Sequence, residues 1–242
     1  MRSEYRDRLD AWLPAILLFT GSAVFLGAGR LHPLINDSLG AIGTTRFYHS
    51  FASEMLHTPH WQAMHLGILL GPIFWALGVA GMVPGLPMES RALGTVASTA
   101  LLIGASFWGV AFVLDGYVGP GLAEPIVAQG EVSDQVAIRA FRANQLTMAR
   151  LGMLSVVLVG AAMSALGVAL LFGWSLRSWR AFVGILGVMA GAWPIFAALT
   201  GRFYPGPFTD RYWTATALSL GVWFLLLGTV LPRLVRQLGT SP

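Results

Sequence analysis

Residues 151–174 read LGMLSVVLVGAAMSALGVALLFGW, an uncharged and almost wholly apolar run. A helix needs about 20 mostly apolar residues to cross the hydrocarbon core of a bilayer, so this run is long enough to cross once. Its apolar residues occupy every face, whereas the strands of a membrane β-barrel alternate polar and apolar residues. The stretch therefore predicts a membrane-spanning helix.

Five further runs of the same kind surround this stretch. Hydrophobic residues make up 55% of the 242 residues and charged residues only 11%, with a mean hydropathy of +0.67. A soluble domain carries roughly 25% charged residues, so we expect an all-α integral membrane protein whose residues 1–242 form a single domain. Its six predicted transmembrane helices are residues 12–29, 65–83, 93–114, 151–174, 181–200 and 213–231. The first run has no clear small-x-small cleavage site, so we expect it to be retained.

Two residue types are missing from the sequence, and each absence excludes some chemistry. Without cysteine there is no disulfide, thiolate catalysis, iron–sulfur ligation or covalent c-type haem. All fifteen basic residues are arginine, which excludes a lysine Schiff base. These arginines form no basic run or stripe, so we expect headgroup anchoring and no nucleic-acid partner. The sequence has no P-loop, dinucleotide fingerprint or nucleophile elbow, and these absences argue against an enzyme.

The connections between the runs predict an orientation in the membrane. The two short links contain Arg91, Arg177 and Arg180 against a single acid, Glu89. Short links rich in arginine stay in the cytoplasm, so we place these links and both termini there, in the cytoplasmic (inner) membrane of a bacterium. All five histidines then lie in the extracytoplasmic half, and we expect any functional site in that half.

The long extracytoplasmic connections are expected to contain short amphipathic helices. Phe47, Phe51 and Met55 recur at helical spacing, which predicts a short helix lying flat at the membrane surface. Ser133 is a suitable N-cap for a second helix that runs on into the fourth crossing. Residues 115–125, DGYVGPGLAEP, are rich in glycine and proline and are predicted to form a turn.

Three of the five histidines fall within nine residues, HTPHWQAMH. Neutral imidazole ligates zinc, copper and haem iron, so His57, His60 and His65 form a candidate metal site. The plainer interpretation is three interfacial histidines hydrogen-bonded to water or headgroups. A His32–His65 pair is the candidate for binding haem, and His65 alone for binding a chlorophyll-type pigment.

An acid and a base flank the loop between the third and fourth crossings. Asp115 ends the third run and Arg150 precedes the fourth. Ionisable groups at membrane depth are costly and usually pair, so we expect an ion pair that ties these helices together, completed by Gln145 and Asn144. A proton or substrate relay at the same residues is the functional alternative.

The connection before the last crossing, GRFYPGPFTDRYW, mixes aromatic and charged residues. Aromatic residues and arginine are enriched both in interfacial belts and at the centres of protein interfaces. This loop is therefore either a membrane-interface belt or a surface for a partner. The candidate contact residues are Arg202, Tyr204, Asp210 and Arg211.

Three short motifs occur together in the first half of the chain. They are His32-Pro33, Trp61-x3-His65 and LDGYVGPGLAE after the third run. In this respect the chain resembles a group of uncharacterised bacterial multi-pass membrane proteins. The resemblance supports the topology and draws attention to His32, His65 and Asp115, but it implies no reaction.

These patterns leave three functions open. We expect a non-catalytic accessory or scaffold subunit that packs, within membrane lipid, against other membrane protein subunits. The alternative is a redox, metal-binding or haem-binding membrane protein with an extracytoplasmic histidine site. A small-solute transporter is the third, although few polar side chains lie at mid-depth. They are Ser22, Ser98, Thr99, Ser106 and Ser164.

Overall fold

The structure is a computed structural model that describes residues 2–33, 39, 43–129, 135–172, 179–200 and 210–238. The side chains of residues 2–11, 210–213 and 233–238 lie outside this description. Every regular element in the described ranges is a helix. In chain order they are α1 (Arg2–Leu31), α2 (Thr45–His57), α3 (Trp61–Met82), the 3-10 turn η2 (Val83–Gly85), α4 (Met88–Val113), the π-helical turn η3 (Leu114–Val118), α5 (Gly119–Ala128), α6 (Gln135–Leu171), α7 (Trp179–Leu199) and α8 (Asp210–Leu238).

Six helical segments within the described ranges are long and apolar enough to cross a membrane, which confirms the predicted number of long apolar helices. Their bounds are Trp12–Leu31, Trp61–Gly85, Met88–Ala128, Gln135–Leu171, Trp179–Leu199 and Thr214–Pro232. The second begins four residues before the predicted start at residue 65. The third runs on to Ala128, and the predicted fourth crossing is only the second half of α6.

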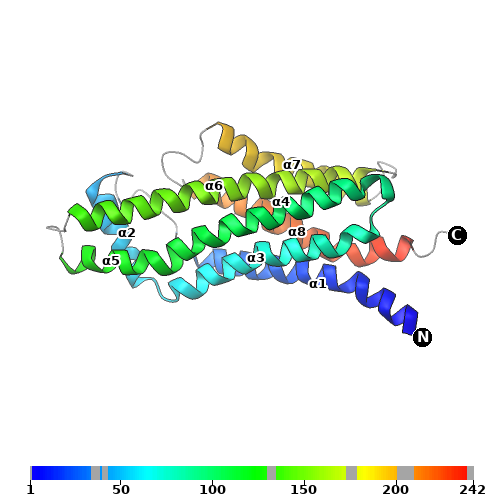
Figure 1. Cartoon of the computed structure of the whole chain (residues 1–242), viewed down its shortest axis with the longest axis horizontal. Coiled ribbons are helices and arrows are strands. Elements are labelled where there is room, and N and C mark those ends of the chain that lie inside the picture. The colour runs from blue at the N-terminus through cyan, green and yellow to red at the C-terminus, as the bar shows by residue number, and fades with distance from the viewer. Residues whose placement is uncertain are drawn as a thin grey trace.

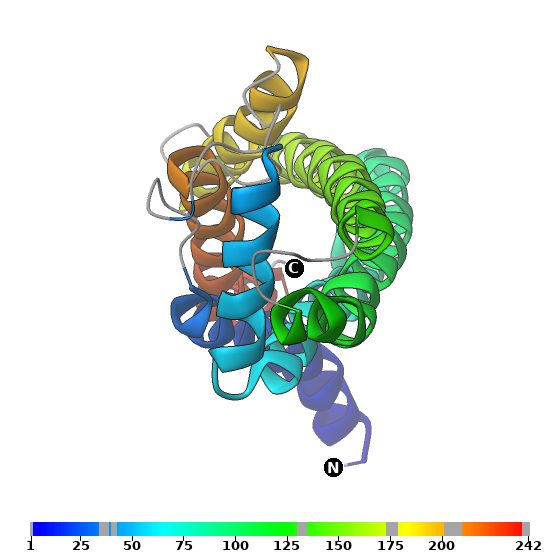
Figure 2. The same ribbon diagram turned by 90° about the vertical axis from the view of Figure 1, so that its left-hand side faces the viewer.

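The long helices lie side by side in an elongated bundle (Figure 1). α1 packs against α3 and α8, α4 packs against α3 and α6, and α7 packs mainly against α6. α2 and α5 lie together at one end of the bundle, which we call the cap end (Figure 1). α1 begins and α8 ends at the opposite end of the bundle (Figure 1). Figure 2, which looks along the bundle from the cap end, shows α2 passing across that end.

The predicted amphipathic helix of the first long connection is confirmed as α2. Thr44 caps it, since its Oγ1 accepts a hydrogen bond from the Phe47 backbone N–H at 3.2 Å. Phe47, Phe51 and Met55 are buried as a stripe. They pack against protein, because α2 contacts α5 and α6 and the rings of Phe51 and Phe141 lie 6.0 Å apart. α2 is therefore a layer of the cap.

The prediction that residues 115–125 form a turn is wrong, because η3 and α5 are continuous helix. Pro120 lies in the first turn of α5, inside this continuous helix, where its missing N–H leaves a carbonyl of η3 without a helical donor. The glycines serve close packing: a Cβ on Gly119 would lie 3.0 Å from the Met55 side chain, and one on Gly116 would lie 2.8 Å from the His65 Cβ. In this segment the glycines therefore reflect close packing against α2 and α3 and not a turn of the chain.

Small residues let the long helices approach one another within the chain. A Cβ on Gly71 would lie 2.6 Å from the Phe25 Cβ, so this glycine seats α3 against α1. Gly167 and Gly184 face each other between α6 and α7, where a Cβ on Gly184 would lie 2.7 Å from the Gly167 carbonyl oxygen. Gly187 lies against the Trp223 ring in the same way. These glycines pack helices of one chain together, as small residues do in membrane bundles.

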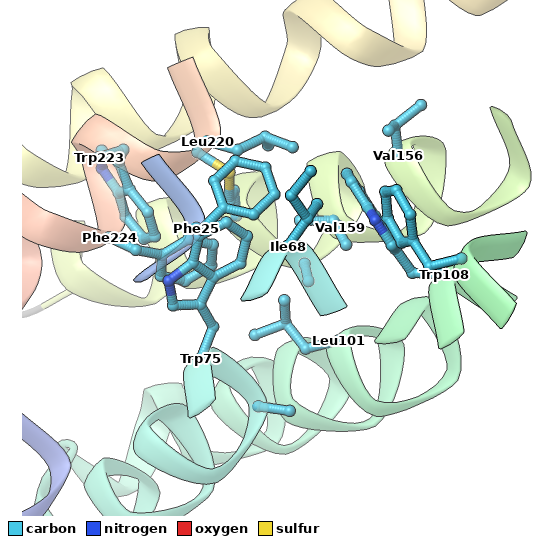
Figure 3. Close-up of a cluster of buried hydrophobic side chains, with 14 of the residues drawn as sticks. Phe25, Ile68, Trp75, Leu101, Trp108, Val156, Val159, Leu220, Trp223 and Phe224 are labelled. Carbon is cyan, nitrogen blue, oxygen red and sulfur yellow. The ribbon is translucent and has the colours of Figure 1, made fainter. Parts of the chain in front are cut away.

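Aromatic side chains fill the middle of the bundle (Figure 3). The Trp75 ring stacks on Phe224 at 4.5 Å and lies 4.8 Å from Phe25. The Trp75 Nε1–H donates to the Ser22 Oγ at 3.0 Å, and this hydroxyl donates to the Leu18 carbonyl at 2.8 Å. Both polar groups thus have partners in the apolar interior.

The polar residues that a transporter would place at mid-depth are not gathered in one place. Thr99 and Ser106 are exposed on α4, and the Ser106 hydroxyl donates to the Leu102 carbonyl of its own helix. Ser22, by contrast, is buried among aromatic rings.

Candidate metal centre

Three side chains with metal-ligating atoms converge at the cap end. They are His32, His65 and Asp115, and one candidate ligand atom from each lies within 4.8 Å of the others. His65 and Asp115 are buried and His32 is half-buried. His32 follows the last turn of α1, His65 lies in the second turn of α3, and Asp115 lies in η3. Only the fold brings these distant segments together.

His65 is held by hydrogen bonds at both ring nitrogens. Its Nδ1 lies 2.7 Å from the Trp61 carbonyl oxygen, and its Nε2 lies 2.9 Å from the Asp115 Oδ2. A carbonyl oxygen can only accept, so Nδ1 carries a hydrogen and donates it. The Nε2 is therefore the atom that faces the cluster, which is the arrangement common for metal-ligating histidines.

The His32 ring also has a hydrogen bond at its Nδ1. Its Nδ1 lies 2.8 Å from the Pro33 carbonyl oxygen and must donate to it, which leaves Nε2 with a lone pair in the neutral ring. Burial, followed by the neighbouring His65, lowers the pKa of His32, while the Asp115 carboxylate acts in the opposite direction. The net effect favours the neutral imidazole, the form that binds a metal.

The Asp115 side chain has partners at both carboxylate oxygens. Oδ2 faces His65, and Oδ1 accepts a hydrogen bond from the Gln145 Nε2 at 3.3 Å. A buried charge is costly unless it is paired and hydrogen-bonded, and these contacts meet that requirement. The hydrogen bond between Asp115 and His65 requires one proton, which lies where a metal ion would bind.

The helix that carries Asp115 is irregular at this residue. In the π-helical turn η3, the Gly119 N–H bonds to the Leu114 carbonyl, five residues back. The Leu114 carbonyl also accepts from the Asn144 Nδ2 at 3.0 Å, and the Asp115 carbonyl accepts from the Trp61 Nε1 at 2.9 Å. Side chains of α3 and α6 thus bond to the backbone of the turn.

Aromatic rings enclose the cluster. The Trp61 ring centroid lies 4.6 Å from that of His65 and 5.5 Å from that of His32, and the Phe112 centroid lies 5.5 Å from that of His65. The two imidazoles meet edge to face with centroids 5.2 Å apart. An apolar wall of this kind limits water and strengthens electrostatic interactions at the centre.

The structure brings together some of the predicted site residues and separates others. His32 and His65 lie side by side, whereas His57 and His60 are exposed and lie outside the described metal-ligating group. The His57 Nδ1 bonds to the Ser53 carbonyl at 2.7 Å, and His60 is the N-cap of α3. Among the described residues, the third candidate ligand next to His32 and His65 is therefore Asp115 from η3.

The expected ion pair between Asp115 and Arg150 is replaced by other contacts. Among the described residues, His65 is the ion-pair partner of Asp115, and the Arg150 side chain is exposed. Gln145 does join the carboxylate as predicted, whereas Asn144 bonds to the backbone one residue earlier. The predicted contact between this segment and α6 therefore exists, but the side-chain amides of Gln145 and Asn144 form it.

The candidate partner surface cannot be placed. Arg202 and Tyr204 lie outside the described residues. Asp210 and Arg211 begin α8, but their side chains lie outside the description.

Sequence reasoning missed two parts of the centre. The Trp61 indole bonds to a carbonyl 54 residues away, and the π-helical turn has no simple sequence signature. The Trp61-x3-His65 spacing was the one available signal, since it places the indole and the imidazole on the same face of α3.

Comparison with protein-family models, curated proteins and solved structures finds no significant match to this chain. Its function is therefore inferred from the geometry of the His32–His65–Asp115 cluster.

Proposed function

We propose that this protein is a multi-pass membrane protein that binds one divalent transition-metal ion through His32, His65 and Asp115. The observation that carries the proposal is the approach of three candidate ligand atoms to within 4.8 Å of one another, two of them from buried side chains. Metal–nitrogen and metal–oxygen bonds of about 2.0–2.2 Å place the ligand atoms of one tetrahedral ion about 3.3–3.6 Å apart, so binding requires only small movements of these side chains. Two imidazoles and one carboxylate suit Zn²⁺, Co²⁺ or Fe²⁺.

The second contacts of the ligands support the same assignment. Each histidine donates its Nδ1–H to a backbone carbonyl, and Gln145 binds the carboxylate oxygen that faces away from His65. Outer hydrogen bonds of this kind fix the orientation of metal ligands and raise their basicity.

The compact cluster favours an ion over haem or a chlorophyll-type pigment. The imidazoles of His32 and His65 are in direct edge contact, and the His65 Nε2 faces a carboxylate at 2.9 Å. A macrocycle on that nitrogen requires Asp115 and the Trp61 ring to move aside. A single ion would replace the proton between His65 and Asp115 and would require only small movements of the three side chains.

The membrane setting is part of the proposal. Six long apolar helices and the arginine-rich short links favour insertion in a bacterial cytoplasmic membrane with the opposite end of the bundle in the cytoplasm. The cap end and the metal centre then lie on the extracytoplasmic side.

The accessory-subunit hypothesis stays a prediction. Exposed apolar side chains on α7, such as Phe182, Ile185 and Met189, suit lipid and a partner helix equally. A scaffold role is compatible with a metal centre, since a bound ion can stabilise the cap.

Metal analysis of the purified protein tests the proposal. We expect one equivalent of Zn²⁺ or Co²⁺ bound by the wild-type protein in detergent, loss of that equivalent in His32→Ala and His65→Ala, and measurable but much weaker binding in Asp115→Asn. His57→Ala is the matched control, because this exposed histidine is also in the cap and is expected to leave binding unchanged. Unfolding temperatures of the metal-free variants separate loss of ligand from loss of fold.

Two results would contradict the proposal. One is a wild-type protein that binds no divalent ion. The other is binding that keeps its wild-type affinity in His32→Ala and Asp115→Asn but disappears in His57→Ala. A Soret band in the native protein would instead favour haem.

A further inference from the structure

The turn that carries Asp115 is the least regular part of the described helices. π-helical turns are rare and often occur at functional sites. Such a turn contains one residue more than a regular helical turn. One residue corresponds to a rotation of about 100° around the helix axis, so η3 sets the direction of everything that follows α4. Asp115 lies inside η3, and its carboxylate points at His65.

Two side chains outside the turn bond to its backbone. Asn144, from α6, donates to the Leu114 carbonyl at 3.0 Å, and Trp61, from α3, donates to the Asp115 carbonyl at 2.9 Å. A buried carbonyl without a partner is costly, so Trp61 supports the Asp115 carbonyl, and Asn144 adds a second donor to the Leu114 carbonyl, which also accepts from the Gly119 N–H. The two donors therefore stabilise the π-helical register from opposite neighbouring helices.

The packing of Gly116 fixes the same turn in space. A Cβ at this position would lie 2.8 Å from the His65 Cβ, so η3 rests directly on the α3 segment that holds the imidazole. The separation between the carboxylate and the imidazole thus depends on the turn as well as on the two side chains.

We infer that Asn144 and Trp61 are positioning residues of the metal centre, which hold η3 in the one register that places the Asp115 carboxylate beside the His65 Nε2. Neither residue supplies a ligand atom to the cluster. Their effect on the metal passes through the direction of Asp115, and it sets whether the carboxylate coordinates the ion. This inference rests on the proposed metal-binding function.

The experiment compares Zn²⁺ affinity and the visible spectrum of bound Co²⁺ in the full-length protein. Asn144→Leu keeps the size of the side chain but removes the donor, and we expect affinity to fall about 10- to 100-fold, the usual effect of losing an outer partner of a metal ligand. The Co²⁺ bands are expected to shift toward those of Asp115→Asn. Trp61→Phe, which keeps an aromatic ring, is expected to change affinity in the same direction. Thr147→Val, an exposed polar-to-apolar change one turn along α6, is the matched control and is expected to bind like the wild type.

A double-mutant cycle separates positioning from general structural support. If Asn144 acts through Asp115, then Asn144→Leu has no further effect on affinity in the Asp115→Asn background. An equal loss in both backgrounds, or wild-type affinity in both Asn144→Leu and Trp61→Phe, overturns the inference while the metal site stands. A wild-type protein without a bound ion overturns the proposed function itself.

Discussion

Asp115 is only 3% exposed, yet its two carboxylate oxygens and its carbonyl oxygen all have partners. These partners come from α3 and α6, on either side of η3. Membrane-embedded or buried acids require such satisfaction, since an unpaired charge in an apolar surrounding is costly.

Gly116 and Gly121 form a matched pair of glycines near this acid. A Cβ on Gly116 would lie 2.8 Å from the His65 Cβ, whereas nothing lies within 4 Å of one on Gly121. We predict that Gly116→Ala destabilises the protein by about 1–3 kcal/mol through overpacking and weakens metal binding. Gly121→Ala is expected to be neutral or to stabilise α5 by up to about 1 kcal/mol. Unfolding in denaturant, followed by circular dichroism, measures both; equal stability of the two variants would contradict the packing argument.

Part of the centre was visible in the sequence at this scale. A histidine at the mouth of an apolar run and an acid at the end of the next are unusual at membrane depth, and both were singled out. Their pairing was not predictable, because a rare π-helical register and the close approach of Gly116 decide it. Proximity along the chain pointed instead to His57 and His60, which the helix start at Trp61 leaves on the surface.

The contact between α6 and α7 is the clearest case of element packing through backbone. Gly167 and Gly184 leave no side chain between the helices, and a Cβ on Gly184 would lie 2.7 Å from the Gly167 carbonyl oxygen. We predict that Gly184→Ala forces the helices apart and destabilises the protein by about 1–3 kcal/mol. Gly27→Ala on α1, which meets nothing within 4 Å, is the control. Unfolding of both variants in mixed micelles gives the comparison, and a Gly184→Ala protein as stable as the control would refute the prediction.

The long elements were predictable because apolar length is a strong signal, and α2 because three apolar residues repeat at helical spacing. η3 and α5 were not predictable, because glycine and proline occur both in turns and where a helix packs closely against a neighbour. The Met55 side chain, which lies against Gly119, shows which of these applies, and only a tertiary contact supplies that information.

The start of α1 and the end of α8 lie at one end of the bundle, and the cap lies at the other (Figure 1). The proposed orientation is testable because the native sequence contains no cysteine. We predict that a single cysteine in Met88→Cys, at the exposed start of α4, reacts with a membrane-impermeant maleimide only after cells are opened. A cysteine in His60→Cys, exposed at the cap end, is expected to react in intact cells. The reverse pattern would invert the topology and place the metal centre in the cytoplasm.

The 37 residues of α6 form one uninterrupted rod. At 1.5 Å per residue it is about 55 Å long, whereas the oily layer of a bilayer is about 30 Å thick. In the proposed orientation, roughly 25 Å of this helix extends beyond the hydrocarbon core, and α2 and α5 pack against it. A change in the tilt of this helix would move its Asn144 end, and with it the contact between Asn144 and the turn that carries Asp115.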